Sequence, residues 1–147
     1  MQITEITEHK KKYLPLLLLA DEQESMIDRY LNRGIMFVLN DGGVKAVAVV
    51  TDEGNSILEL KNLAVEPDFQ NQGYGRAMID FLSASFAGQF QTLQVGTGDS
   101  PLTLPFYEKC GFQRSHVIKN FFTDHYDHPI WEGGVQLVDM VYLKKKI

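Results

Sequence analysis

The segment from Leu58 to Ala77, LELKNLAVEPDFQNQGYGRA, constrains the fold more than any other part of this 147-residue chain. An apolar, strand-like run ends at Val65, a proline-containing turn follows, and a segment with helical periodicity begins near Arg76. Backbone N–H groups in a glycine-rich turn before a helix have no helical partner, and the helix dipole adds partial positive charge there. The sequence therefore predicts a site for a phosphate-bearing ligand at this turn.

Two common phosphate-binding motifs do not fit the turn. A dinucleotide fingerprint needs a third glycine three residues after Gly75, where Met78 stands. A P-loop needs a lysine directly after the second glycine, where the chain has Arg76. What remains is the pattern Gln-x-x-Gly-x-Gly, formed by Gln70, Gly73 and Gly75. The simplest alternative is that the two glycines only permit a tight turn with positive φ.

A second motif lies further downstream, in the run PFYEKCGF from Pro105 to Phe112. Its pattern predicts a short helix that carries Tyr107 inward and ends at Gly111 in a left-handed C-cap, with Phe112 opening the next strand. Two motifs in a fixed order are more specific than either alone.

Together the motifs resemble the signatures of the GNAT superfamily of acetyl-CoA-dependent N-acetyltransferases. The glycine turn looks like the family's acetyl-CoA signature, and the second run is similar to its F/L-Y-E-K-x-G-F signature. The resemblance extends from about Phe37 to Val117. It implies one N-acetyltransferase domain over residues 1–147, an α/β fold of the α+β type. Its mixed central sheet would be an antiparallel meander plus one parallel βαβ crossover, flanked by helices.

The resemblance also implies which residues bind acetyl-CoA as co-substrate. Backbone N–H groups of the glycine turn would hold the pyrophosphate, and the strand before it would pair with the pantetheine arm, with the amide of Leu63 polarising the thioester. Ser100 stands where many relatives carry an asparagine that contacts the arm, so it departs from the pattern, as does Pro105, which should kink the helix of Tyr107. The implied binding set is Leu63, Ala64, Val65, Gln70, Asn71, Gln72, Gly73, Tyr74, Gly75, Arg76 and Ser100.

Two residues are candidates for catalysis of acetyl transfer to a primary amine. Tyr107 matches the tyrosine of the second signature and is the candidate acid for the leaving thiolate; packing alone is the alternative. Glu59 is a carboxylate in an otherwise apolar strand, where burial would raise its pKa toward that of a useful base. Its alternative is a solvated sheet residue or a partner for Lys61.

Composition limits the class of partner. The net charge of −5 argues against nucleic acid and mildly favours a cationic amine, either a small molecule or a peptide. The single cysteine, Cys110, excludes an internal disulfide and suits a reducing compartment, and no apolar run is long enough to span a membrane, so we expect a cytoplasmic protein. His125 and His128 have metal-like spacing, but no cysteines accompany them, so we predict no metal.

Two other functions remain open: a non-catalytic acyl-CoA-binding module of the same fold, and a phosphate-binding domain of unrelated chemistry. A homodimer through an exposed final strand is a further possibility. The lysines at 144–146 should form a solvated tail, and residues 120–134 a substrate-facing or packed surface loop. Periodicity predicts strands at 1–7, 35–39, 44–51, 56–65, 90–95, 112–118 and 136–143. It predicts helices at 10–20, broken or offset near Pro15, at 21–33 and at 76–86, with a further helix capped by Asp99 or Ser100 and beginning at Pro101.

Overall fold

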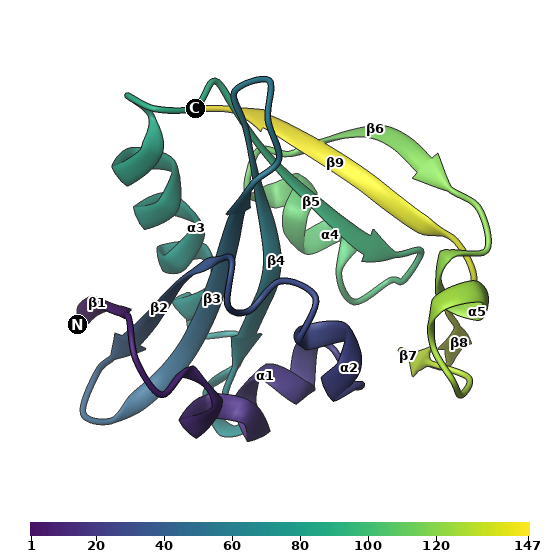
Figure 1. Cartoon of the computed structure of the whole chain (residues 1–147), viewed down its shortest axis with the longest axis horizontal. Helices are drawn as coiled ribbons and strands as arrows, with labels where there is room; N and C mark the ends of the chain where they lie inside the picture. The colour runs from purple at the N-terminus through teal and green to yellow at the C-terminus, as the bar shows by residue number, and fades with distance from the viewer.

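The computed structural model describes all 147 residues and is built around a seven-stranded sheet in the order β1-β2-β3-β4-β5-β9-β6. Only β4 and β5 run parallel; every other neighbouring pair is antiparallel. This confirms the predicted mixed sheet with one parallel crossover (Figure 1). The strands are β1 (Gln2–Ile6), β2 (Ile35–Asn40), β3 (Val44–Asp52), β4 (Ile57–Val65), β5 (Thr92–Gly98), β6 (Gln113–Ile118) and β9 (Met140–Lys146), with a small separate pair, β7 (Trp131–Glu132) and β8 (Val135–Gln136).

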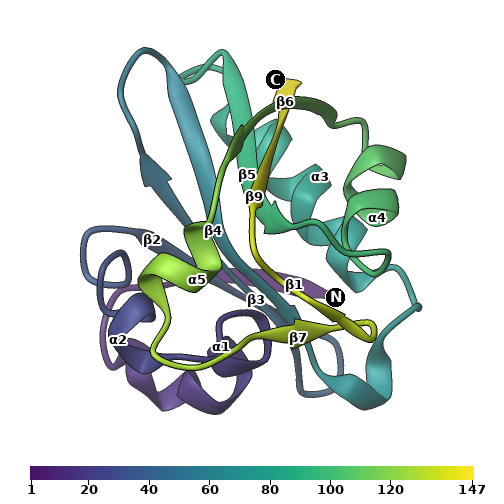
Figure 2. The ribbon, with the colours of Figure 1, turned by 90° about the vertical axis from the view of Figure 1, so that its right-hand side faces the viewer.

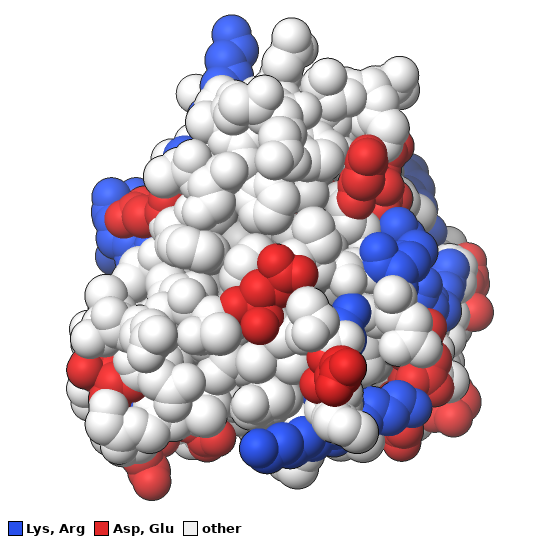
Figure 3. Space-filling view, turned by 60° about the vertical axis from the view of Figure 1, so that its left-hand side comes forward, with Lys and Arg blue, Asp and Glu red and all other residues white.

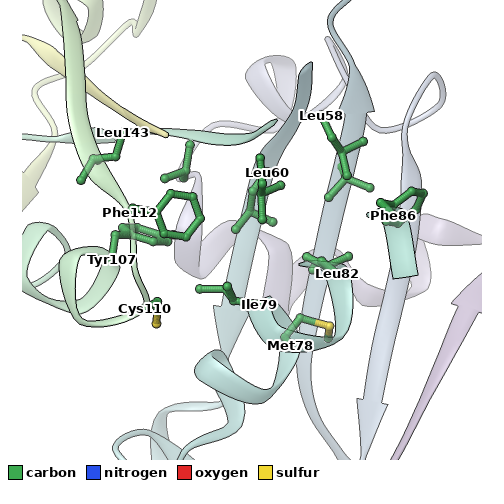
Figure 4. Close-up of a cluster of buried hydrophobic side chains, with 14 of the residues drawn as sticks. Leu58, Leu60, Met78, Ile79, Leu82, Phe86, Tyr107, Cys110, Phe112 and Leu143 are labelled. Carbon is green, nitrogen blue, oxygen red and sulfur yellow. The ribbon is translucent and has the colours of Figure 1, made fainter. Parts of the chain in front are cut away.

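Helices cover both faces of the sheet. They are η1 (Lys10–Tyr13), α1 (Leu14–Ala20), α2 (Glu24–Ile27), η2 (Pro67–Phe69), α3 (Tyr74–Phe86), α4 (Leu104–Lys109) and α5 (Phe121–His125). The larger core lies between the sheet and the α3–α4 layer, where the apolar stripe of α3 meets Leu58 and Leu60 of β4 (Figure 4). A second core packs α1 and α2 against the opposite face.

A β-bulge in β4 decides which side chains reach each core. On β4, Asn62 lies opposite Val49 of β3. Leu60 lies opposite Val50, the next residue of β3, which leaves Lys61 as an extra residue without a partner. A bulge of this kind bends its strand and reverses the alternation of side chains beyond it.

Because of this reversal, the alternation of side chains between the two faces of the sheet shifts by one residue after Lys61. Strict alternation would put Leu60 and Leu63 on opposite faces of the sheet. Both instead pack into the core beside α3, and Ala64 belongs to the core beneath α1. Asn62 likewise points toward α1, where its amide donates to the carbonyl of Leu17.

The predictions of a strand at 136–143 and of a solvated lysine tail at 144–146 were wrong. The expected strand at 136–143 divides into the short β8 and the longer β9, and the lysines at 144–146 are no free tail, because they pair with Thr92 to Gln94 of β5. Lys145 donates to the carbonyl of Cys110, so its stem covers the core while its charge is satisfied. Since β9 lies between β5 and β6, the last strand has no free edge for a second copy.

The helical segment at 10–20 is interrupted near Pro15 as predicted, because η1 ends at Tyr13 and α1 begins at Leu14 with Pro15 in its first turn. The expected helix at 21–33 was too long, since it shortens to α2 followed by turns. Pro101 does not begin a helix: residues 101–103 form a turn, and neither Asp99 nor Ser100 is the cap, because α4 begins at Leu104 after Thr103. Pro105 therefore stands in the first turn, where its missing N–H costs no helical bond and causes no kink.

The surface is mixed in charge. Figure 3 shows acidic and basic side chains interspersed over one face, around a broad uncharged area. None of the helices is both long and apolar enough to cross a membrane.

Candidate active site

The glycine turn presents a row of unpaired backbone donors. Asn71 and Gly73 adopt left-handed φ values of 61° and 90°, and helix α3 begins at Tyr74. The first backbone bond in this region is donated by Ala77 to the carbonyl of Gly73. The N–H groups from Asn71 to Arg76 consequently donate to no backbone acceptor. They lie in the turn before the 13-residue helix α3 and in its first turn, where the helix dipole is positive. This arrangement can bind a pyrophosphate.

Side chains hold the turn without blocking those donors. The hydroxyl of Tyr74 donates to Asp41 at 2.7 Å, and Arg76 donates to the carbonyl of Lys109 at 3.2 Å. A Cβ atom at Gly75 would lie 3.0 Å from the ring of Phe106, so a larger residue there would require that ring on α4 to shift. The second glycine of the motif is therefore fixed by packing, and the first by its positive φ.

A cavity of about 660 Å³ opens where β4 and β5 separate. The two strands pair only as far as Leu60 and Val95; beyond these residues they diverge, which Figure 1 shows as a V between the two ribbons. Beyond these residues neither strand is the other's hydrogen-bonding partner, although the carbonyl of Val65 accepts from the side-chain amide of Gln70 at 3.2 Å. Leu63, Ala64 and Val65 line the cavity from β4, and Gln70 and Asn71 connect it to the glycine turn. A thin, extended chain that ends in a pyrophosphate fits this shape.

Tyr107 lines the same cavity from α4. Its ring packs against Phe106 and Phe112 with centroid distances of 5.1 and 5.6 Å, as the close-up shows for Phe112 (Figure 4). Burial raises the pKa of its phenol, with smaller contributions from Cys110 and Glu132, so the hydroxyl stays protonated at neutral pH. A protonated phenol beside a reacting thioester can act as an acid.

Glu59 is buried but does not line the cavity, although its neighbours Leu60 and Lys61 do. Lys61 pairs with its carboxylate at 2.7 Å, Gln94 donates to it from the adjacent β5, and Tyr142 donates to it from β9, the strand beyond β5. The sequence suggested that Glu59 is a catalytic base, a solvated sheet residue or a partner of Lys61, and the structure contains the ion pair with Lys61. Any proton that reaches Glu59 from the cavity must cross an intervening group or water.

The remaining residues of the implied acetyl-CoA-binding set do not line the cavity. Gln72, Gly73, Tyr74, Gly75 and Arg76 lie in the glycine turn and at the start of α3, outside the cavity wall. Ser100 is buried and does not line the cavity; its hydroxyl accepts from the N–H of Leu102 and so stabilises the turn before α4.

The far end of the cavity is built from segments that sequence motifs did not identify. Asp21 and Glu22 follow α1, and Tyr126 and Glu132 come from the segment after β6. Figure 2 shows α5 and β7 crossing in front of α1 and α2, where Tyr126 donates to Asp21 at 2.6 Å. His125 and His128 lie on this segment, and no group of three or more potential metal ligands gathers around them.

A model of the acetyltransferase (GNAT) domain family matches residues 32–114. The chain belongs to the GNAT family. It is 36% identical over 131 residues to the uncharacterized N-acetyltransferase YvbK of Bacillus subtilis (strain 168), covering 87% of this chain and 84% of that protein. A GNAT family acetyltransferase from Elizabethkingia anophelis, solved with acetyl-CoA bound, superposes with a TM-score of 0.92 at 33% identity, covering 99% and 97% of the two chains.

A third GNAT relative has a stated acceptor. The [ribosomal protein bS18]-alanine N-acetyltransferase of Escherichia coli (strain K12) is 30% identical over 97 residues, covering 65% of this chain and 63% of that protein. These relationships make the chain an acetyl-CoA-dependent N-acetyltransferase. The unpaired donors of the glycine turn and the diverging edges of β4 and β5 suit that co-substrate.

Proposed function

We propose that this GNAT enzyme transfers the acetyl group of acetyl-CoA directly to a primary amine while both substrates are bound. The observation that carries the proposal is the continuity of one cavity. Gln70 and Asn71 lead into it from the anion-binding turn, and Asp21 and Glu22 line its opposite end. The thioester and the amine can then meet between β4 and β5 without a covalent enzyme intermediate.

The coenzyme is held by main-chain groups in this proposal. The N–H groups of Asn71, Gly73, Gly75 and Arg76 bind the pyrophosphate, since none of them has a backbone partner. The free edge of β4 from Leu63 to Val65 pairs with the pantetheine arm as a neighbouring strand would. The N–H of Leu63 then polarises the thioester carbonyl and stabilises the negative charge that develops on its oxygen.

Proton transfer completes the reaction. The amine nitrogen attacks the thioester carbon, a C–N bond forms and the C–S bond breaks. Tyr107 protonates the leaving thiolate from inside the cavity. Glu59 takes the proton of the amine through water, because its carboxylate lies one layer behind the wall formed by Leu60 and Lys61. Acetylated amine and coenzyme A are the products.

The test measures binding and chemistry separately. Thermal unfolding with acetyl-CoA, coenzyme A, ATP and NAD should show stabilisation of a few degrees by the coenzyme A forms alone, as expected for a ligand specific to the native state. Thiol release on addition of primary amines should follow. Binding of coenzyme A without thiol release from any amine would contradict the transfer reaction, and equal stabilisation by ATP would contradict the assignment of the turn.

A further inference from the structure

Asn62 has a buried acceptor that nothing in the protein satisfies. The residue is 3% exposed and lines the cavity. Its amide nitrogen donates to the carbonyl of Leu17 at 3.0 Å and to the hydroxyl of Tyr30 at 3.1 Å. Because a carbonyl can only accept, the contact with Leu17 fixes which end of the amide is nitrogen. The oxygen of Asn62 is left without a hydrogen-bond partner. A buried acceptor of this kind calls for a donor from a ligand.

Two unpaired carboxylates lie on the same cavity. Glu22, which is exposed, comes from the turn after α1, and the half-buried Glu132 comes from β7, so two distant segments of the chain supply carboxylates to one cavity. Neither forms an ion pair or a side-chain hydrogen bond. Burial raises the pKa of Glu132, and the charge of Glu22 raises it further. Two carboxylates on one cavity wall, with no basic partner for either, favour a positively charged ligand.

The rest of the cavity supplies no internal cation. Lys61 is the only basic residue of its wall, and that lysine is paired with Glu59. The third carboxylate, Asp21, is already engaged by the hydroxyls of Tyr30 and Tyr126. Apolar side chains also line this cavity, among them Leu63, Ile130 and Trp131. A ligand with an aliphatic body and a charge at each end matches this distribution.

Resting on the proposed acetyl transfer, we infer that the acceptor is a small aliphatic diamine. Its reacting nitrogen donates to the oxygen of Asn62, next to the thioester held at Leu63. Its second ammonium lies between Glu22 and Glu132. A monoamine leaves both carboxylates unpaired, and the neutral backbone of an ordinary peptide N-terminus brings no second cation to them.

The first experiment compares acceptors with the full-length enzyme. Thiol release is measured with 1,4-diaminobutane, with the matched monoamine 1-aminobutane, and with an alanine-initiated tetrapeptide amide. The diamine should show a kcat/KM about fivefold or more above that of the monoamine, the scale of an added charge contact near a surface. Equal values, or a preference for the peptide, would overturn the inference while leaving amine transfer intact. No release from any of the three would remove the transfer reaction and the inference together.

The second experiment tests the two ends of the site. Glu22→Gln and Glu132→Gln should each lower the ratio of diamine to monoamine kcat/KM, whereas Glu5→Gln, on the exposed edge strand β1, should leave it unchanged. Asn62→Ala should raise KM for both amines by a similar factor. Val49→Ala, at the buried position opposite Asn62 on β3 and outside the cavity wall, controls for loss of packing. An unchanged ratio in both glutamate variants, or an unchanged KM in Asn62→Ala, would contradict the assignment.

Discussion

The hydroxyl of Tyr126 donates a 2.6 Å hydrogen bond to the carboxylate of Asp21, which lies 105 positions earlier in the chain. Tyr30 donates to the other oxygen of the same carboxylate at 2.9 Å. This link holds the segment after β6 against the end of α1, so the far end of the cavity joins two distant segments of the chain. The glycine turn, in contrast, lies within one continuous strand–turn–helix unit.

Tyr126→Phe should loosen that joint. The variant loses one hydrogen bond to a charged group, so we expect the free energy of unfolding to fall by about 1–2 kcal/mol. The KM for the amine should rise while the affinity for acetyl-CoA stays the same, because the glycine turn is remote from the link. Denaturant unfolding and initial-rate kinetics measure both effects. Tyr13→Phe, outside the cavity, is the matched control, and an unchanged amine KM would show that the link has no role in acceptor binding.

Gly75→Asp should abolish coenzyme binding. The new Cβ would meet Phe106 at 3.0 Å, and the added carboxylate would repel the pyrophosphate in the anion-binding turn. Gly88→Asp makes the same chemical change just beyond α3, where a Cβ meets nothing within 4 Å. Calorimetric titration with acetyl-CoA should detect binding to the Gly88 variant only. Normal affinity in a folded Gly75 variant would remove the turn from the binding site.

The glycine turn could be predicted from the sequence because its signals are local. Gln70, Gly73 and Gly75 define a turn through spacing and backbone geometry, and the structure places that turn at the start of α3 as expected. Tyr107 was also placed correctly on the cavity wall by its short helix.

The far end of the cavity could not be predicted from the sequence because the residues that form it are distant in the chain. The sequence of β4 does not indicate the β-bulge at Lys61. That bulge nevertheless turns the side chain of Asn62 toward α1. The proximity of Glu22 and Glu132 depends on how the segment after β6 folds back over the sheet. The lysines of β9 were misread as a tail because their pattern is polar, although β5 and β6 flank them in the sheet.

Glu59→Gln tests whether Glu59 is a catalytic base or only a structural partner of Lys61. If Glu59 takes the amine proton, the variant should flatten the acid limb of the pH–rate profile and lower kcat by about 10²-fold or more. The loss of the ion pair with Lys61 should also reduce stability, since that lysine is left without its partner. Thr51→Val, which removes a nearby buried hydroxyl, controls for disturbance of the strands. A lower melting temperature with an unchanged acid limb would leave Glu59 a purely structural role.

Glu22→Gln should move the pH dependence of diamine use. Binding of the second ammonium requires ionised Glu132, whose pKa is raised by burial and then by the charge of Glu22. Removing that charge lowers the pKa of Glu132, so the acid limb of kcat/KM for the diamine should shift to lower pH. For stability the sign is opposite to that of a paired carboxylate: a raised folded pKa means that protonation favours the native state, and this contribution is lost as the pH rises through that pKa. An acid limb that stays in place would contradict coupling between the two residues.

Tyr107→Phe should slow the chemistry and spare the coenzyme site. Burial keeps the phenol of Tyr107 protonated, and the ring packs between Phe106 and Phe112, so phenylalanine preserves the shape while it removes the acid. We expect kcat to fall by about 10²-fold or more, with little change in acetyl-CoA affinity or melting temperature. Acceleration of this variant, relative to wild type, by an acetyl thioester with a more acidic thiol would identify the lost step as protonation of the leaving group, because such a thiolate needs less help to depart. An unchanged kcat with acetyl-CoA would show that Tyr107 serves only to pack α4 against the sheet.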